Sequence, residues 1–135
     1  MKTSLKISIL LLSIFLFNEC KKDSTKPPIV TTLEVTEITK TTAISGGELN
    51  EMTPLIVSKG ICWGTEQNPT TENFKSIDFS SNTNFLCIMT GLAPNTKYYV
   101  RANAINIAGT SYGKQIEFTT LINNSGKLST INEIE

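Results

Sequence analysis

Hydrophobic and polar residues alternate in short runs from Ile29 to Thr120, and turn-forming residues interrupt these runs about every ten positions. Alternation with period two is typical of strands with one buried face, and no stretch carries the 3.6-residue apolar repeat of a helix. The pattern predicts strands at residues 30–39, 41–49, 56–64, 74–79, 84–92, 97–106 and 111–120. Seven short strands in one domain are typical of an antiparallel β-sandwich, so the predicted fold class is all-β.

The most informative stretch is the turn that begins at Leu92 and leads into the strand beginning at residue 97. Leu92 closes an apolar run, Pro94 fixes φ and removes a backbone donor, and Asn95 tolerates turn geometry. Tyr98 opens the next strand, where its ring can be buried while its hydroxyl bonds to a main-chain group a few residues upstream. We therefore assign Leu92, Pro94 and Tyr98 to a structural corner, with no catalytic role.

Together these residues resemble a known family. The string Leu92-x-Pro-x-Thr-x-Tyr98 is similar to one corner and the following strand of fibronectin type III domains. Further segments resemble the fibronectin III-like repeats of bacterial cell-surface lipoproteins; they are Thr41 to Gly47, Gly60 to Gly64, Asn68 to Thr70 and Ala108 to Gly113. The resemblance covers residues 29–120 and implies a seven-stranded immunoglobulin-like sandwich that acts as a non-enzymatic module.

The N-terminus has the pattern of a targeting segment, which we place at residues 1–19. Two lysines precede an apolar run from Ile7 to Phe17, which is shorter than the roughly 20 residues that a transmembrane helix needs. Cys20 follows and resembles the acylated cysteine of the bacterial lipobox, although Glu19 departs from that motif. A lipid anchor on Cys20 is the expectation, and an uncleaved or differently cleaved signal is the alternative.

Polar residues flank the predicted sandwich on both sides. Residues 20–28 include Lys21, Lys22 and Asp23 and end in two prolines, a composition typical of a flexible tether. Residues 121–135 have scattered apolar positions without a clear period, and we expect this tail to be poorly ordered. With the lipobox resemblance, this organisation implies a lipid-anchored protein of the cell envelope, at the outer membrane or surface of a Gram-negative bacterium.

Charge and composition argue against several classes of function. The 135 residues carry 12 basic and 12 acidic side chains, so no net field favours nucleic acid. The sequence has no histidine, which removes the commonest general base and the commonest metal ligand. Carboxylates are spread singly and no phosphate-binding loop is present. We expect no catalytic residues, no metal site and no cofactor.

Two further cysteines, Cys62 and Cys87, lie in predicted strands on opposite sheets. Export to an oxidising compartment would allow a disulfide between them. However, packed sheets lie about 10 Å apart and a disulfide needs Cα atoms within about 7 Å. Buried free thiols are therefore the default, and Cys87 should share a core face with Phe85 and Met89.

Aromatic residues are the remaining candidates for a binding surface. Trp63, Phe74, Tyr99 and Tyr112 could stack on sugars or anchor a protein contact, although their spacing forms no aligned platform and Trp63 fits a core position better. The favoured function is an anchored interaction or spacer module that binds protein or glycan. The alternatives are a purely structural stalk, a remnant of a larger surface protein and, least favoured, a small metal-dependent hydrolase.

Overall fold

The computed structural model describes residues 26–50 and 55–123, and within these ranges the protein forms eight strands and no helix. The strands are β1 (Val30–Thr36), β2 (Ala43–Leu49), β3 (Ser58–Gly64), β4 (Phe74–Asp78), β5 (Asn84–Met89), β6 (Lys97–Asn106), β7 (Gly109–Tyr112) and β8 (Ile116–Thr119). The signal segment, Cys20 and the tail beyond Asn123 lie outside the described residues.

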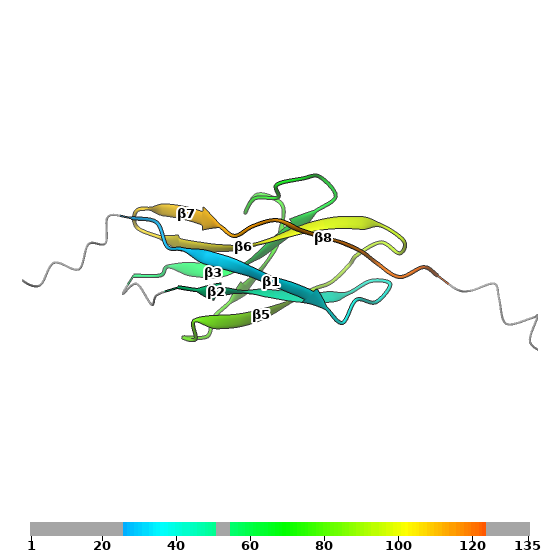
Figure 1. Cartoon of the computed structure of the whole chain (residues 1–135), viewed down its shortest axis with the longest axis horizontal. Coiled ribbons are helices and arrows are strands. Elements are labelled where there is room, and N and C mark those ends of the chain that lie inside the picture. The colour runs from blue at the N-terminus through cyan, green and yellow to red at the C-terminus, as the bar shows by residue number, and fades with distance from the viewer. Residues whose placement is uncertain (1–25, 51–54, 124–135) are drawn as a thin grey trace, which may run out of the picture.

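The strands form two antiparallel sheets that pack face to face (Figure 1). One sheet has the order β1-β2-β5. In the other, β4, β3 and β6 lie side by side, and β7 and β8 pair with successive halves of β6. The predicted all-β sandwich is confirmed, and the described chain enters at one end of the long axis and leaves at the other (Figure 1).

The last predicted strand, 111–120, is broken into β7 and β8 at residues 113–115, so its prediction as one strand is wrong. The break lies where β1 packs closely against Gly113. A Cβ on this glycine would lie 2.3 Å from the hydroxyl oxygen of Thr32 in β1. That hydroxyl accepts a hydrogen bond from the main-chain N–H of Ala102 at 3.0 Å. Thr32 thus links the two sheets at the point where the neighbouring strand is interrupted.

Two other strands are shorter than predicted. β1 ends at Thr36, because Glu37 has a positive φ of 47° that takes the chain out of the sheet. β5 ends at Met89, and Gly91 follows with a φ of 68°. Leu92 is therefore a buried corner residue, not the last residue of a strand as predicted.

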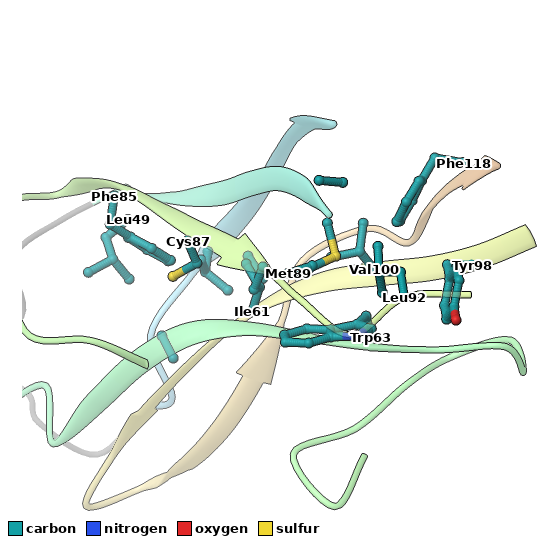
Figure 2. Packing of buried hydrophobic residues seen from close by; sticks show 14 residues of the cluster. Leu49, Ile61, Trp63, Phe85, Cys87, Met89, Leu92, Tyr98, Val100 and Phe118 are labelled. Carbon is teal, nitrogen blue, oxygen red and sulfur yellow. The ribbon is translucent and has the colours of Figure 1, made fainter. Parts of the chain in front are cut away.

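The core lies between the two sheets and is built by alternation along the central strands (Figure 2). In β6, Tyr98, Val100, Ala102 and Ala104 are all buried, as the period-two pattern predicted. In β5, Phe85, Cys87 and Met89 face inward while Leu86 and Ile88 face outward. Trp63 is buried in the same cluster. Its core position confirms that it is not a displayed aromatic residue.

The glycine pair of β2 marks a close approach between neighbouring backbones. A Cβ on Gly46 would lie 1.9 Å from the carbonyl oxygen of Phe85, on the adjacent strand. A Cβ on Gly47 would lie 2.5 Å from the Phe85 ring and 2.8 Å from the Ala102 side chain of the opposite sheet. Only glycine fits at these two positions without movement of the neighbouring atoms.

Candidate functional site

The corner before β6 is held by the hydroxyl of Tyr98. The main-chain N–H of Ala93 donates to this oxygen at 2.9 Å, which ties the turn back onto the strand. The Tyr98 ring packs on Phe118 of β8 with ring centres 5.8 Å apart (Figure 2). Leu92 is buried beside them, and Asn95 has the positive φ of 50° that the turn requires. The arrangement is structural, since the hydroxyl is used by the backbone.

Thr120 is a second anchor of this corner, and the sequence reasoning missed it. Its hydroxyl donates to the carbonyl of Ala93 at 2.6 Å and accepts from the N–H of Thr96 at 3.0 Å. The side chain is buried, which leaves the hydroxyl no competing water. A threonine at a strand end gives no periodic signal, so only the fold identifies its partners.

The two thiols face different environments and are not bridged. Cys87 lies in the core and its sulfur approaches the carbonyl of Ser76 at 3.8 Å. Cys62 lies on the opposite face of β3 from the core residues Ile61 and Trp63. Cys87 points from β5 into the core between the sheets, whereas Cys62 points from β3 away from that core, so the structure has no disulfide between them.

Cys62 is covered by the connection between β3 and β4, residues 65–73, which we call the covering loop. The thiol donates to the carbonyl of Pro69 at 3.4 Å and to that of Arg101 at 3.6 Å. Burial raises the pKa of Cys62 from 9.0 to about 11, against opposing effects of Arg101 and Asn103. Burial also raises the pKa of Cys87. Neither thiol is a ready nucleophile at neutral pH, because each is held in its protonated form.

Two further side chains fix the covering loop on the outer face of the sheet. The guanidinium of Arg101 lies 4.3 Å from the centre of the Tyr112 ring, a cation–π contact. The Tyr112 hydroxyl accepts from the N–H of Thr71 at 3.2 Å, and Arg101 donates to the carbonyl of Pro69 at 3.4 Å. Tyr112 therefore helps to hold this loop in place, although the sequence analysis proposed it as a candidate for a binding surface.

A hollow of about 390 Å³ lies where the covering loop leaves and rejoins the sheet. Phe74 forms one side of the hollow and is 72% exposed. Its ring stacks on that of Trp63, with the two ring centres 6.3 Å apart. Exposed Glu66, Glu72 and Asn73 supply polar groups around it. Of the four aromatic candidates, Phe74 is the one displayed beside polar groups, the combination that sugar or peptide contacts use.

Lys59 points to the inner face of the sandwich, where it forms a buried ion pair with Asp78. The Nζ–Oδ2 distance is 2.5 Å, and the two side chains are 5% and 17% exposed. Lys59 also donates to the carbonyl and the hydroxyl of Ser80, and its ammonium lies 5.3 Å from the centre of the Phe85 ring. Burial alone would raise the pKa of Asp78, but hydrogen bonds from Lys59 and Ser80 hold it below its ordinary value.

The sequence analysis did not single out Lys59, although a signal was present. Lys59 shares strand parity with the core residues Ile61 and Trp63, so period-two alternation places all three on one face. A lysine on a core face must be paired or shift its pKa. The pair forms one wall of an open pocket of about 520 Å³, which is otherwise mainly apolar and includes Leu49, Ile56, Val57, Ile77 and Phe79.

Comparison with solved structures places this architecture among known domains. The fibronectin III domain of human contactin 1 has a TM-score of 0.58 at 17% identity, over 83% of this chain and 94% of that one. The corresponding domain of human fibronectin type III domain containing protein 3 has a TM-score of 0.53 at 18% identity, over 79% and 98%. The fold is fibronectin type III-like.

A bacterial neighbour shares this fibronectin III-like fold. It is the sensor domain of the anti-sigma factor RsgI4 of Pseudobacteroides cellulosolvens, with a TM-score of 0.54 at 17% identity, over 77% of this chain and 99% of that one. At such identities the likeness establishes the fold alone. No protein-family model matches the chain, and no curated protein matches it either.

The fibronectin III-like domain holds no group of three or more cysteine or carboxylate side chains that could bind a metal, within residues 26–50 and 55–123. The same residues include no helix of the length and apolarity needed to cross a bilayer. Two features of the described domain are candidates for binding. One is the hollow at Phe74, and the other is the pocket beside the Lys59–Asp78 ion pair.

Proposed function

We propose that the protein is a non-enzymatic lipoprotein of the bacterial cell envelope, in which one fibronectin III-like domain serves as an interaction or spacer module. In this proposal residues 1–19 direct export, Cys20 carries the lipid, and residues 20–28 tether the domain to the outer membrane of a Gram-negative cell. Protein or glycan is the expected partner. Nucleic acid is not, because the chain has no net positive charge.

The observation that carries the proposal is the position of the chain ends. The described chain enters the sandwich at one end of its long axis and leaves at the other (Figure 1). At the exit end, the N–H of Asn95 donates to the carbonyl of Leu121, and the N–H of Leu121 donates to that of Thr39. A domain anchored by its entry end would thus hold its opposite end away from the membrane, which is the geometry of a spacer.

The covering loop and Phe74 supply the surface for presentation. The loop begins next to Gly64, which pairs with Tyr99 near the start of β6 and therefore lies towards the exit end. Arg101 and Tyr112 fix the loop, so its surface is preformed. Binding of a partner would therefore lose little conformational entropy in ordering the loop. Exposed aromatic and carboxylate groups beside each other suit a glycan or a peptide rather than a polyanion.

Metabolic labelling tests the anchor. Radiolabelled palmitate should enter the wild-type chain and should not enter Cys20→Ala. Cys87→Ala is the matched control, because this thiol is buried in the core and should leave labelling unchanged. Equal labelling of wild type and Cys20→Ala would refute the lipoprotein proposal.

A second experiment separates interaction from spacing. Detergent-extracted protein is applied to a glycan array and crosslinked to envelope components, with Phe74→Ser as the variant and Leu86→Ser as the control, because Leu86 is similarly exposed (68%) but lies on the outer face of β5. Saturable binding that Phe74→Ser abolishes supports an interaction module with the hollow as its site. Blank results in both assays favour a purely structural spacer, which is the second candidate.

A further inference from the structure

Exposed apolar side chains gather at the end where the chain enters the domain. Phe79 is 92% exposed, Val57 71%, Ile107 70% and Ile29 67%. Leu55 and Ile77, which are 46% and 44% exposed, complete the group that we call the apolar end. Single exposed apolar residues are ordinary, but a group of this size at one end of a domain marks an interaction surface.

Main-chain contacts hold these residues at the same end although they come from separate connections. The N–H of Asn50 donates to the carbonyl of Ile29, and the N–H of Val57 donates to that of Ile105, two residues before Ile107. Val57, Ile77 and Phe79 border the same open pocket. The side-chain amide of Asn106 donates to the carbonyl of Lys26 at 2.7 Å, which fixes the incoming chain against this end.

An ion pair neutralises the two charged residues that line the pocket. Lys59 and Asp78 lie at its wall and form this pair with each other. Neither of these two side chains therefore presents a free charge that would oppose transfer of Val57 or Phe79 into a less polar medium. The apolar end is also not a flat sheet face, since its residues lie in connections and at strand ends.

We propose that the apolar end seats in the headgroup region of the bilayer to which the protein is anchored. This inference rests on the proposed lipid at Cys20. Six peptide units join Cys20 to Lys26, so the entry end lies within roughly 20 Å of the anchor when the tether is fully extended. The ten residues of β6 span roughly 33 Å, which keeps the exit end in water when the domain stands on its apolar end.

We infer a lipid surface as the occupant because the proposed lipid anchor precedes the apolar end in the chain and would hold this end close to the bilayer. The apolar run Ile7 to Phe17 and Cys20 both precede the point of entry. Protruding isoleucine, valine and phenylalanine side chains suit shallow insertion of about 5–10 Å into the headgroup and acyl boundary.

Fluorophores on two matched positions test the seating. Val57→Cys and Leu86→Cys place a label at exposed aliphatic positions, 71% and 68% exposed, with Leu86 on the outer face of β5. The native Cys62 and Cys87 are buried with raised pKa values and should not react in the folded protein. The acylated full chain is reconstituted into phosphatidylethanolamine–phosphatidylglycerol vesicles, and flotation verifies attachment.

We expect iodide quenching of the label at position 57 to fall by a factor of about three or more relative to position 86, because insertion shields it from water. Phe79→Glu should restore quenching at position 57 while flotation persists. Equal quenching at both positions on floating vesicles would overturn the inference and leave the anchor intact. Loss of flotation would refute the anchor and the seating together.

Two other results would also overturn the inference. Shielding of position 57 in lipid-free detergent solution that increases with protein concentration would identify a second copy as the occupant. Shielding of position 86 on vesicles would mean that the outer face of the β1-β2-β5 sheet, and not the apolar end, contacts the bilayer.

Discussion

The ion pair between Lys59 and Asp78 should make a large and specific contribution to stability. Asp78→Asn removes the negative charge and leaves the Lys59 ammonium, 5% exposed, with only neutral partners. Removing one partner of a buried pair costs about 3–5 kcal/mol, and we expect the lower end because the Ser80 acceptors and the Phe85 ring remain. The expected loss of about 3 kcal/mol corresponds to a fall in Tm of about 12–24 °C.

Chemical denaturation measures this loss directly. Trp63 is the only tryptophan and is buried in the core, so its emission should report unfolding of the sandwich. The double variant Lys59→Met/Asp78→Asn should recover to within about 1 kcal/mol of wild type, because apolar replacement of a buried pair is often neutral. Lys97 and Glu117 provide the matched control, since their 3.7 Å pair is more than half exposed. Glu117→Gln should cost less than about 0.5 kcal/mol.

The pair also predicts a dependence on acid. The folded-state pKa of Asp78 lies below its unfolded value, so its contribution is complete above about pH 4. This contribution is lost as pH falls through the lower folded-state pKa. The double variant should lose less stability than wild type across that range. A cost below about 0.5 kcal/mol for Asp78→Asn, or an equal acid response of wild type and double variant, would refute the reasoning.

Two further predictions concern the corner and the buried thiol. Tyr98→Phe should lower the free energy of unfolding by about 1 kcal/mol, because the N–H of Ala93 loses its acceptor at the domain surface. Tyr99→Phe is the control and should have little effect. Identical melting midpoints for wild type and Tyr98→Phe would contradict the structural role of the Tyr98 hydroxyl. Cys62 has a folded-state pKa raised from 9.0 to about 11, so its contribution to stability is complete below about pH 9 and is lost as pH rises towards 11. Denaturation at about pH 8, below that window, and at about pH 10.5, within it, should show a smaller alkaline loss of stability for Cys62→Ala than for wild type. Parallel losses would exclude the thiol as the cause.

The features that the sequence predicted are local in the chain. The part of the corner that was predicted involves Leu92, Asn95 and Tyr98, which lie within seven positions of one another, and their turn chemistry is readable residue by residue. Strand periodicity likewise predicted the inward residues of β5 and β6. The predicted strands 56–64 and 74–79 leave a connection where the covering loop lies, but the position of this loop over Cys62 was not predicted. That position depends on Arg101 and Tyr112, which are distant in sequence.

The interruption between β7 and β8 shows where periodicity fails. Ile116 and Phe118 alternate with Glu117 as a strand should, and the residues before them are also compatible with an extended chain. The strand breaks at Gly113 because Thr32, far away in sequence, occupies the space beside it and takes the N–H of Ala102. Local preference cannot report a contact with the opposite sheet, so a single continuous strand was the natural prediction.

The proposed interaction surface at the apolar end is the feature least visible in the sequence, for a topological reason. Ile29 lies just before β1, whereas Val57, Phe79 and Ile107 lie in three separate connections, and each alone is an ordinary exposed apolar residue. Antiparallel pairing of β1 with β2, and of β3 with β4 and β6, brings the relevant strand ends to one end of the domain. The fold thus brings residues that are scattered in sequence together in one apolar end, beside the point where the chain enters the domain.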